Sequence, residues 1–280
     1  MLLVTTRTPR LPRPPASARI RTGMGGWTFA PWRGVFYPEA LVQKHELEYA
    51  SRQVSTIEIN GTYYRSPGID TYRKWAAETP DGFVFSVKAP RYIVQTKRLS
   101  TSGDRMVKFL DGVVGLGDRL GPILWQLLPT RRFDADDMAG FLALLPAKHD
   151  GVALRHAVEV RHDSFMDERW LALAREHGVA TVFTDSPDHP SFADITGPFV
   201  YARLMRSRTT QAGGYPPKER DAWATRAIAW ASGGDPEDLP HVGAPHTAKA
   251  ARDVFVYFIS AAKERNPAAA VALAKLTNHA

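Results

Sequence analysis

Strand-like and helix-like segments alternate along almost the whole chain, and this alternation constrains the fold more than any other feature. Runs rich in apolar and β-branched residues are typical of strands, at residues 18–26, 55–60, 83–89, 121–127, 156–161, 178–185, 198–204 and 253–259. Amphipathic stretches typical of helices lie between or after them, at residues 42–53, 69–78, 104–116, 134–145, 167–178, 217–231 and 267–279. This order predicts an α/β protein with a single (β/α)8 TIM-type barrel domain.

Two further patterns bear on the fold. Helix starts are indicated by Asp104, Asp134, Asp167 and Pro217. A doubly wound open sheet is the alternative architecture, but the glycine-rich end of the first strand is not followed by a GxGxxG motif, which disfavours a dinucleotide-binding fold.

The net charge of +7 is concentrated at the N-terminus. Residues 1–21 contain five arginines and no acidic residue, so about +2 remains for the rest of the chain. The same segment is rich in proline and lacks the apolar core of a signal peptide. We therefore expect a disordered Pro/Arg-rich extension over residues 1–17 and the barrel domain over residues 18–280, with an arm that contacts phosphates as the alternative.

The chain contains no cysteine, which excludes disulfides, thiolate nucleophiles and cysteine metal ligands. No run approaches the roughly 18 apolar residues that suggest a membrane helix. We therefore expect a cytoplasmic protein that does not contact a membrane.

Polar side chains gather at the carboxyl ends of the predicted strands. Because side chains alternate in a strand, Glu58 and Asn60 share one face, and Glu159 and Arg161 share one face of another strand. The same rule gives an inward set on the other strands: Val84, Ser86, Lys88, Leu124, Gln126, Thr181, Phe183, Asp185, Phe199, Tyr201 and Arg203. Barrel enzymes place their active sites at this end, so we expect a functional pocket; an ion-pair network that only plugs the barrel is the alternative.

The residue types at this end predict acid/base chemistry on an anion. Two carboxylates in different surroundings can act as acid and base, and we assign catalytic roles to Glu58, Glu159 and Lys88. Lys88 and Arg203 are suited to hold phosphate or carboxylate. Glu159, Asp185 and His162 could instead ligate a divalent metal, but His162 points to the other face of its strand from Glu159. We expect no metal and no cofactor.

At these same strands the chain resembles the domain of unknown function 72 family. The resemblance is carried by the stretches GWTFAPWRGVFYPEAL, LEYASRQVSTIEINGTYYRSP, FVFSVKAPRYI, LWQLLP, AVEVRHDSF, TDSP and YARL. It implies a TIM-type barrel whose activity is unassigned. The recurrent polar residues of the family fall here on Trp27, Glu58, Asn60, Tyr64, Lys88, Gln126, Glu159, Arg161, His162, Asp185 and Arg203.

From these residues we expect a substrate-binding set of Trp27, Asn60, Tyr64, Gln126, Arg161, Asp185 and Arg203. Gln95 and Met205 stand where the family usually has histidines, and Ile259, Ser260 and Ala269 stand where it usually has asparagines. The resemblance therefore implies a divergent member.

Three functions follow as hypotheses. The first is an enzyme, of hydrolase, lyase or isomerase class, acting on a small anionic and sugar-like molecule. The second is a metal-dependent enzyme that cleaves phosphodiesters in nucleic acid, and the third is a non-catalytic protein that binds nucleic acid or another ligand. Binding to nucleic acid that weakens with salt would favour the second or third.

Overall fold

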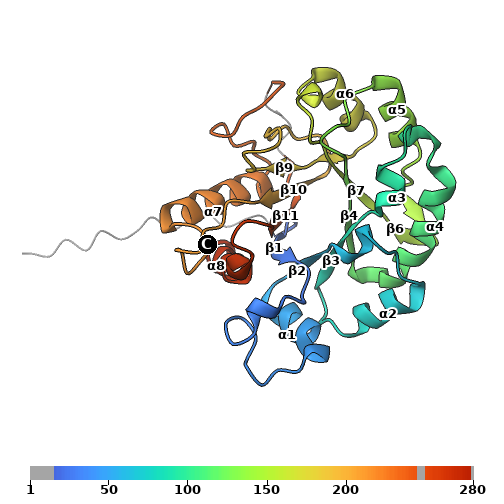
Figure 1. The fold of residues 1–280 in the computed structure, drawn as a ribbon. Helices are drawn as coiled ribbons and strands as arrows, with labels where there is room; N and C mark the ends of the chain where they lie inside the picture. Colours follow the sequence, from blue (N-terminus) through green and yellow to red (C-terminus); the bar gives the residue numbers. More distant parts are fainter. Residues whose placement is uncertain (1–15, 245–249, 279–280) are drawn as a thin grey trace, which may run out of the picture.

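The computed structural model describes residues 16–244 and 250–278, which form a parallel β-barrel surrounded by helices (Figure 1). The strands are β1 (Ile20–Gly25), β2 (Thr56–Ile59), β3 (Val84–Lys88), β4 (Leu120–Gln126), β7 (Arg155–Glu159), β8 (Ala180–Thr181), β9 (Phe183–Thr184), β10 (Phe199–Leu204) and β11 (Asp253–Phe258). They are hydrogen-bonded in the order β8-β7-β4-β3-β2-β1-β11-β10-β9.

The sheet closes on itself through β8 and β9. Val182 alone separates them, so they are two halves of one strand. The first half pairs with β7 and the second with β10, both in parallel. The predicted (β/α)8 barrel is confirmed, and each predicted strand run overlaps an observed strand.

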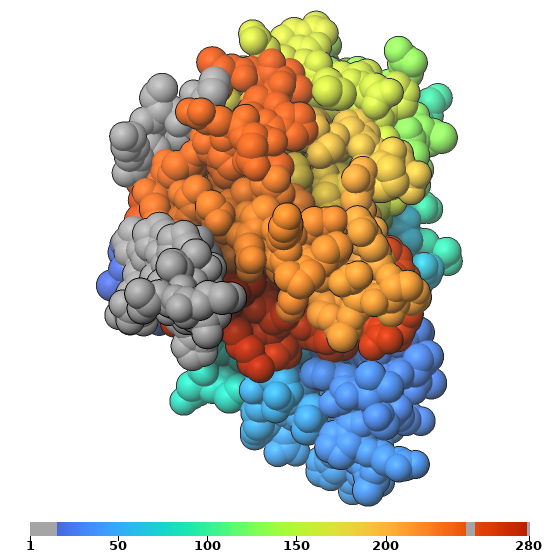
Figure 2. All heavy atoms as spheres, turned by 90° about the vertical axis from the view of Figure 1, so that its left-hand side faces the viewer, coloured from blue at the N-terminus to red at the C-terminus, as the bar shows by residue number. Residues whose placement is uncertain are grey.

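The helices lie between the strands or after the last one, and all of them except α3 overlap segments that the sequence predicts to be helical. They are α1 (Glu46–Gln53), α2 (Ile69–Ala77), α3 (Arg91–Val94), α4 (Gly103–Val113), α5 (Ala135–Ala143), α6 (Glu168–Glu176), α7 (Pro217–Ala231) and α8 (Asn266–Asn278). The last of them packs against β1 and α7, and Thr22 donates a hydrogen bond from its hydroxyl to the Ala270 carbonyl at 3.0 Å. Figure 2 shows the red C-terminal atoms between the orange segment around α7 and the blue segment that follows β1.

Three of the four predicted helix starts are confirmed. Asp134 and Asp167 cap α5 and α6, each accepting a hydrogen bond from a backbone N–H of the first turn. Pro217 is the first residue of α7, where its missing N–H is not needed. The start predicted at Asp104 was two residues too late, because Ser102 is the N-cap residue of α4 and Asp104 lies in the first turn of the helix.

A short hairpin before β7 was not predicted. It pairs β5 (Lys148–His149) with β6 (Val152–Ala153) in antiparallel fashion. Its two turn residues, Asp150 and Gly151, have φ of 44° and 82°. An Asp-Gly pair with positive φ at both positions is typical of a two-residue hairpin, so the signal was present in the sequence.

Two groups of buried side chains show which way each strand faces. One group fills the barrel and consists of Val84, Leu124, Ala157, Ala180, Val182, Phe199, Tyr201, Phe255, Tyr257 and Ile259. Residues of the opposite parity, such as Ile57, Phe85 and Trp125, belong to the larger cluster between strands and helices. This confirms the predicted inward faces of the third, fourth and seventh strands.

The inward face predicted for the sixth strand was wrong by one residue. Ala180 and Val182 point into the barrel, whereas Phe183 packs on Trp223 and Trp230 of α7. Thr181 and Asp185 share the parity of Phe183 and face the same way. The uncharged run Ala-Thr-Val-Phe-Thr gives no hydrophobic alternation, and a slip of one residue moves every side chain to the other face.

The predicted N-terminal extension, residues 1–17, lies almost wholly outside the described residues, so this domain boundary stays a prediction. None of the described helices combines the length and the apolar character that crossing a bilayer requires.

Candidate functional site

The site is built around Arg203, which lies at the end of β10 and bridges two carboxylates. Its Nε and Nη2 donate to the two oxygens of Glu58 at 3.0 and 2.9 Å, and its Nη1 donates to Glu159 at 2.5 Å. Both glutamates are fully buried, and the Arg203 side chain is 3% exposed. Charges so deeply buried are tolerated because each is paired and hydrogen-bonded.

Glu159, at the end of β7, receives more hydrogen bonds than any other part of this cluster. Arg161 Nε donates to it at 2.6 Å, and Gln126 Nε2 lies 3.1 Å from both of its oxygens. Burial by itself raises the pKa of Glu159, but Arg203 and Arg161 outweigh burial and hold this pKa at about 2. The carboxylate is therefore ionised at every physiological pH.

A layer of hydroxyl groups supports the ionic cluster from inside the barrel. Tyr201 donates to Glu58 at 2.6 Å, and its hydroxyl lies 2.7 Å from that of Ser86. One layer away, the hydroxyls of Thr56 and Tyr257 are 2.8 Å apart. Burial and then the negative charge of Glu58 raise the pKa of Tyr201 well above its usual value, so this phenol stays protonated and acts as a donor.

A cavity of about 650 Å³ opens directly above this cluster, at the carboxyl ends of the strands. Its lining includes the cations Lys88, Arg161, Arg203 and Lys263 and no acidic residue. Four positive charges therefore face the cavity, and the two glutamates beneath offset only two of them. The geometry favours a ligand that carries negative charge.

Lys88, at the end of β3, differs from the other cations of the site. Its ammonium lies 4.3 Å from the ring centre of Tyr63 and makes no ion pair or hydrogen bond with another side chain of the described residues. Burial, and next the positive charge of Arg203, lower the pKa of Lys88 to about 8, against the opposing effect of the two glutamates. An amine with this pKa can give or take a proton near neutral pH.

Lys263 is a cavity residue that the sequence did not single out. It follows β11 in a short 3-10 helix (Lys263–Arg265), and its ammonium lies 4.3 Å from the ring centre of Phe29. Burial lowers its pKa as well. The turn before it has left-handed backbone at Ser260 and Ala261, with φ of 58° and 44°, which brings the lysine back over the barrel mouth. No local pattern marks such a turn, because neither residue is a glycine.

Aromatic side chains form part of the cavity wall. Trp27 follows β1 and meets Trp75 of α2 edge to face, with ring centroids 5.2 Å apart. Both line the cavity, together with Asn60. The aromatic segment after β1 is mostly packed rather than free, because Trp32 is fully buried and donates from Nε1 to the Lys263 carbonyl at 2.9 Å.

The structure brings together most of the predicted site residues. Those that line the cavity are Trp27, Asn60, Lys88, Gln126, Arg161 and Arg203. Glu58 and Glu159 lie beneath them as the partners of Arg203.

Two predicted residues lie elsewhere. Tyr64 is 71% exposed and points to solvent, and its neighbour Tyr63 takes the place beside Lys88. Asp185 is outside the cavity because the sixth strand faces the other way. Its carboxylate accepts from the Met205 N–H at 2.5 Å and from the Tyr215 hydroxyl at 3.0 Å, and so holds the chain that follows β10.

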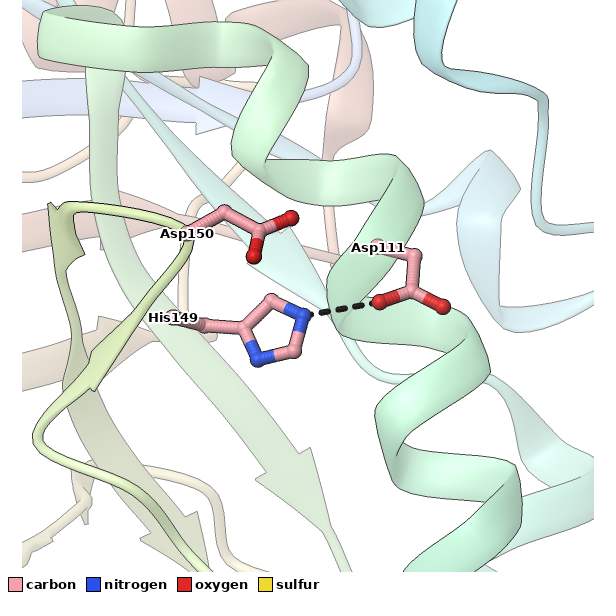
Figure 3. A group of neighbouring side chains, drawn as sticks. All are labelled: Asp111, His149 and Asp150. Carbon is pink, nitrogen blue, oxygen red and sulfur yellow. Dashed lines mark hydrogen bonds and ion pairs between the residues drawn. The ribbon is translucent and has the colours of Figure 1, made fainter.

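The alternative metal ligands do not converge at the mouth of the barrel. Glu159 is held by three side chains, and Asp185 is engaged by the segment after β10. His162 turns away, as expected, and accepts through Nδ1 from the Ser164 N–H at 3.1 Å. Another group, Asp111, His149 and Asp150, lies within ligand distance of one another at the opposite end of the barrel, between α4 and the β5–β6 hairpin (Figure 3). This group is partly exposed to solvent, and none of its residues lines the cavity.

The comparisons with known proteins agree with the fold. The family model described as "Protein of unknown function DUF72" matches residues 21–280. The chain belongs to the DUF72 family. This confirms the resemblance read from the strand motifs.

Solved structures of DUF72 family proteins share the architecture. One from Thermotoga maritima has a TM-score of 0.71 at 20% identity and covers 92% of this chain and 99% of its own. Another from Enterococcus faecalis has a TM-score of 0.67 at 17% identity and covers 94% of this chain and 99% of its own. At these identities the likeness shows the fold alone.

A curated relative is UPF0759 protein YecE of Escherichia coli (strain K12), 30% identical over 148 residues. The match covers 50% of this chain and 52% of YecE, so the chain spans about half the length of that relative.

Proposed function

We propose that this DUF72 protein is an enzyme that binds a small anionic molecule at the barrel mouth and moves a proton with Lys88. The observation that carries the proposal is the cavity, where the ammonium groups of Lys88 and Lys263 form no ion pair with any described residue and lie above two carboxylates already paired with arginines. A phosphate or carboxylate group of the ligand would supply the missing partner.

The ionisation of the site favours Lys88 over the glutamates as the acid/base group. Glu159, with its pKa held at about 2, is a poor proton donor at neutral pH. Lys88, with its pKa lowered to about 8, is close to the value that a general acid or base needs. In this proposal Glu58 and Glu159 keep Arg203 and Arg161 ionised and fixed in place, and so position the anion.

The walls of the cavity bear on the rest of the substrate. Trp27 and Trp75 offer ring surfaces, and Asn60 offers an amide beside them. Sugars bind proteins through such a combination of stacking and hydrogen bonding. We therefore infer that a sugar-like body carrying a phosphate or carboxylate is the substrate class.

Calorimetric titration with inorganic phosphate and with a set of sugar phosphates tests the binding part. Lys88→Met keeps the apolar stem and removes the charge, and Lys44→Met on the exposed surface is the matched control. We expect the Lys88 variant to bind phosphate about tenfold or more weakly, the effect of one lost charged hydrogen bond, and the control to match the parent protein. Equal binding by the parent and the Lys88 variant would contradict the proposal.

A turnover screen of the same sugar phosphates tests the catalytic part. Loss of a proton-transfer group lowers the rate roughly 10²- to 10⁴-fold. Lys88→Arg preserves the positive charge but not the lowered pKa. We expect it to bind anions while losing the rate, and full activity of this variant would show that Lys88 only binds.

A further inference from the structure

The loops that follow β3 and β4 form a second basic surface next to the cavity. Residues 89–102 and 127–133 contain no aspartate or glutamate. They carry the cations Arg91, Lys97, Arg98, Arg131 and Arg132, which we call the basic rim. All but Arg131 are exposed to solvent.

A groove of about 610 Å³ runs through this surface, lined by Lys97, Arg98, Arg131 and Arg132. Asp134 and Asp137 also border it, so the groove keeps a surplus of two positive charges. Both acids have structural partners already: Asp134 caps α5, and the Asp137 carboxylate accepts from the backbone of Leu99 and Ser100 at 3.0 and 3.1 Å. Arg131 and Arg98 lie 3.5 and 3.9 Å from the Asp137 carboxylate. Lys97 and Arg132 form no ion pair with any of the described residues and are available to a partner.

The groove and the cavity are joined by a continuous set of contacts. Tyr63 lies beside Lys88 in the site, and its hydroxyl accepts from Gln95 at 2.9 Å. Thr96 and Lys97 follow Gln95 in the chain, and Arg131 donates hydrogen bonds to their carbonyl oxygens. A ligand lying in the groove would therefore run toward the mouth of the barrel.

Exposed aromatic rings border the same surface. Tyr64 and Tyr92 are 71% and 40% exposed. The guanidinium of Arg91 lies 5.8 Å from the ring centre of Tyr64. Tyr92 follows Arg91 in the chain and lines a neighbouring hollow together with Arg105 and Lys108. Large rings held at the surface, rather than in the core, are the usual platforms on which unpaired bases stack.

We propose that the basic rim binds a single-stranded nucleic acid. Backbone phosphates lie along Lys97, Arg98, Arg131 and Arg132, and bases stack on Tyr64 and Tyr92. Basic residues in a groove combined with exposed rings are the two features that single-strand binding needs. An acidic peptide would satisfy the charges but leave the rings without a role. This inference does not depend on the chemistry assigned to the cavity.

Fluorescence anisotropy of a labelled single-stranded 12-mer, made as DNA and as RNA, tests the proposal on the full chain. The rim variant is Lys97→Gln/Arg98→Gln/Arg132→Gln. It leaves Arg131 in place because Arg131 holds the backbone of its neighbours. The matched control is Lys44→Gln/Lys218→Gln/Lys275→Gln, which removes three exposed charges near α1 and on α7 and α8, on the other side of the barrel from α3 (Figure 1).

We expect the rim variant to bind at least about tenfold more weakly, and the slope of log K against log salt to fall by about 2, since each phosphate contact with a single strand contributes roughly 0.7. The control should stay within twofold of the parent. Tyr64→Leu should weaken binding about fivefold or more without changing the salt slope, because stacking releases no counterions.

Three results would overturn the proposal. One is the absence of binding at low salt, and another is an equal loss in the rim variant and the control, which would assign binding to overall charge. The third is competition by a glutamate 12-mer as effective as that by unlabelled oligonucleotide, which would show that the surface recognises charge alone.

Discussion

Replacing Arg203 by methionine tests whether the buried ion cluster holds the barrel mouth together. The substitution keeps an apolar stem of similar length and removes the three donors that serve Glu58 and Glu159. Glu159 retains Arg161 and Gln126, but among the described residues the Glu58 carboxylate retains only the hydrogen bond from the Tyr201 hydroxyl. One fully buried carboxylate is thus left without a cation.

Breaking a buried pair by removing one partner lowers the free energy of unfolding by about 3–5 kcal/mol, and we expect this loss at pH 7 to 8. The matched control is Arg73→Met, which breaks an exposed ion pair with Asp70 and should change stability by less than about 1 kcal/mol. Adding Glu58→Gln to Arg203→Met should recover most of the loss, because the stranded charge is then gone.

The effect should depend on pH with a definite sign. In the parent protein the pKa of Glu159 is depressed by folding. Its contribution to the free energy of unfolding is therefore present above about pH 4.3, its pKa in the unfolded chain, and is lost as the pH falls toward 2. The variant lacks the Arg203 charge that helps to depress the pKa of Glu159, so it loses less stability than the parent as the pH falls. The difference between the two proteins should shrink by about 1.4 kcal/mol for each unit by which the pKa of Glu159 is less depressed in the variant. Urea unfolding at pH 3 and pH 8 measures it. A difference below about 1 kcal/mol, or one that does not change with pH, would refute the reasoning.

Three further predictions concern single residues. Because the pKa of Lys88 is lowered to about 8, its side chain carries a positive charge below this pH and loses it above. The affinity for sulfate, measured by calorimetry, should therefore fall as the pH rises through 8 to 9, and Lys88→Arg should bind sulfate without this decline. Burial raises the pKa of Asp185, so its charged form opposes folding above its usual pKa; Asp185→Asn should leave the melting temperature at pH 8 unchanged or higher, and a large drop would show that the charge itself holds the segment. A Cβ at Gly23 would lie 1.9 Å from the Thr56 carbonyl oxygen across the β1–β2 pair, so Gly23→Ala should lower the free energy of unfolding by more than about 2 kcal/mol. The control is Gly61→Ala, whose Cβ would meet nothing within 4 Å and whose free energy of unfolding should stay within about 1 kcal/mol of the parent.

Much of the site was predictable because strand parity is a local property. Glu58, Lys88, Gln126, Glu159 and Arg203 each end an apolar run whose alternation is clear. Once those runs form parallel neighbours, their carboxyl ends share one edge of the sheet and the side chains must converge. The inward face of the sixth strand could not be predicted in this way, because apolar and polar residues do not alternate along it. Asp185 was placed on the wrong face for that reason.

The sequence by itself determined the (β/α)8 architecture, the family and the end of the barrel at which the polar residues meet. The architecture and the polar end follow from periodicities of 2 and 3.6 residues, which neighbouring residues set without reference to the rest of the chain, whereas the family follows from the resemblance of the strand motifs. Only the tertiary structure decided that Arg203 is shared between Glu58 and Glu159, that Tyr63 rather than Tyr64 lies beside Lys88, and that Lys263 enters the cavity. Such pairings depend on closure of the barrel, strand register and the path of a left-handed turn, and the pKa values of the site follow from the burial and neighbouring charge that these contacts create.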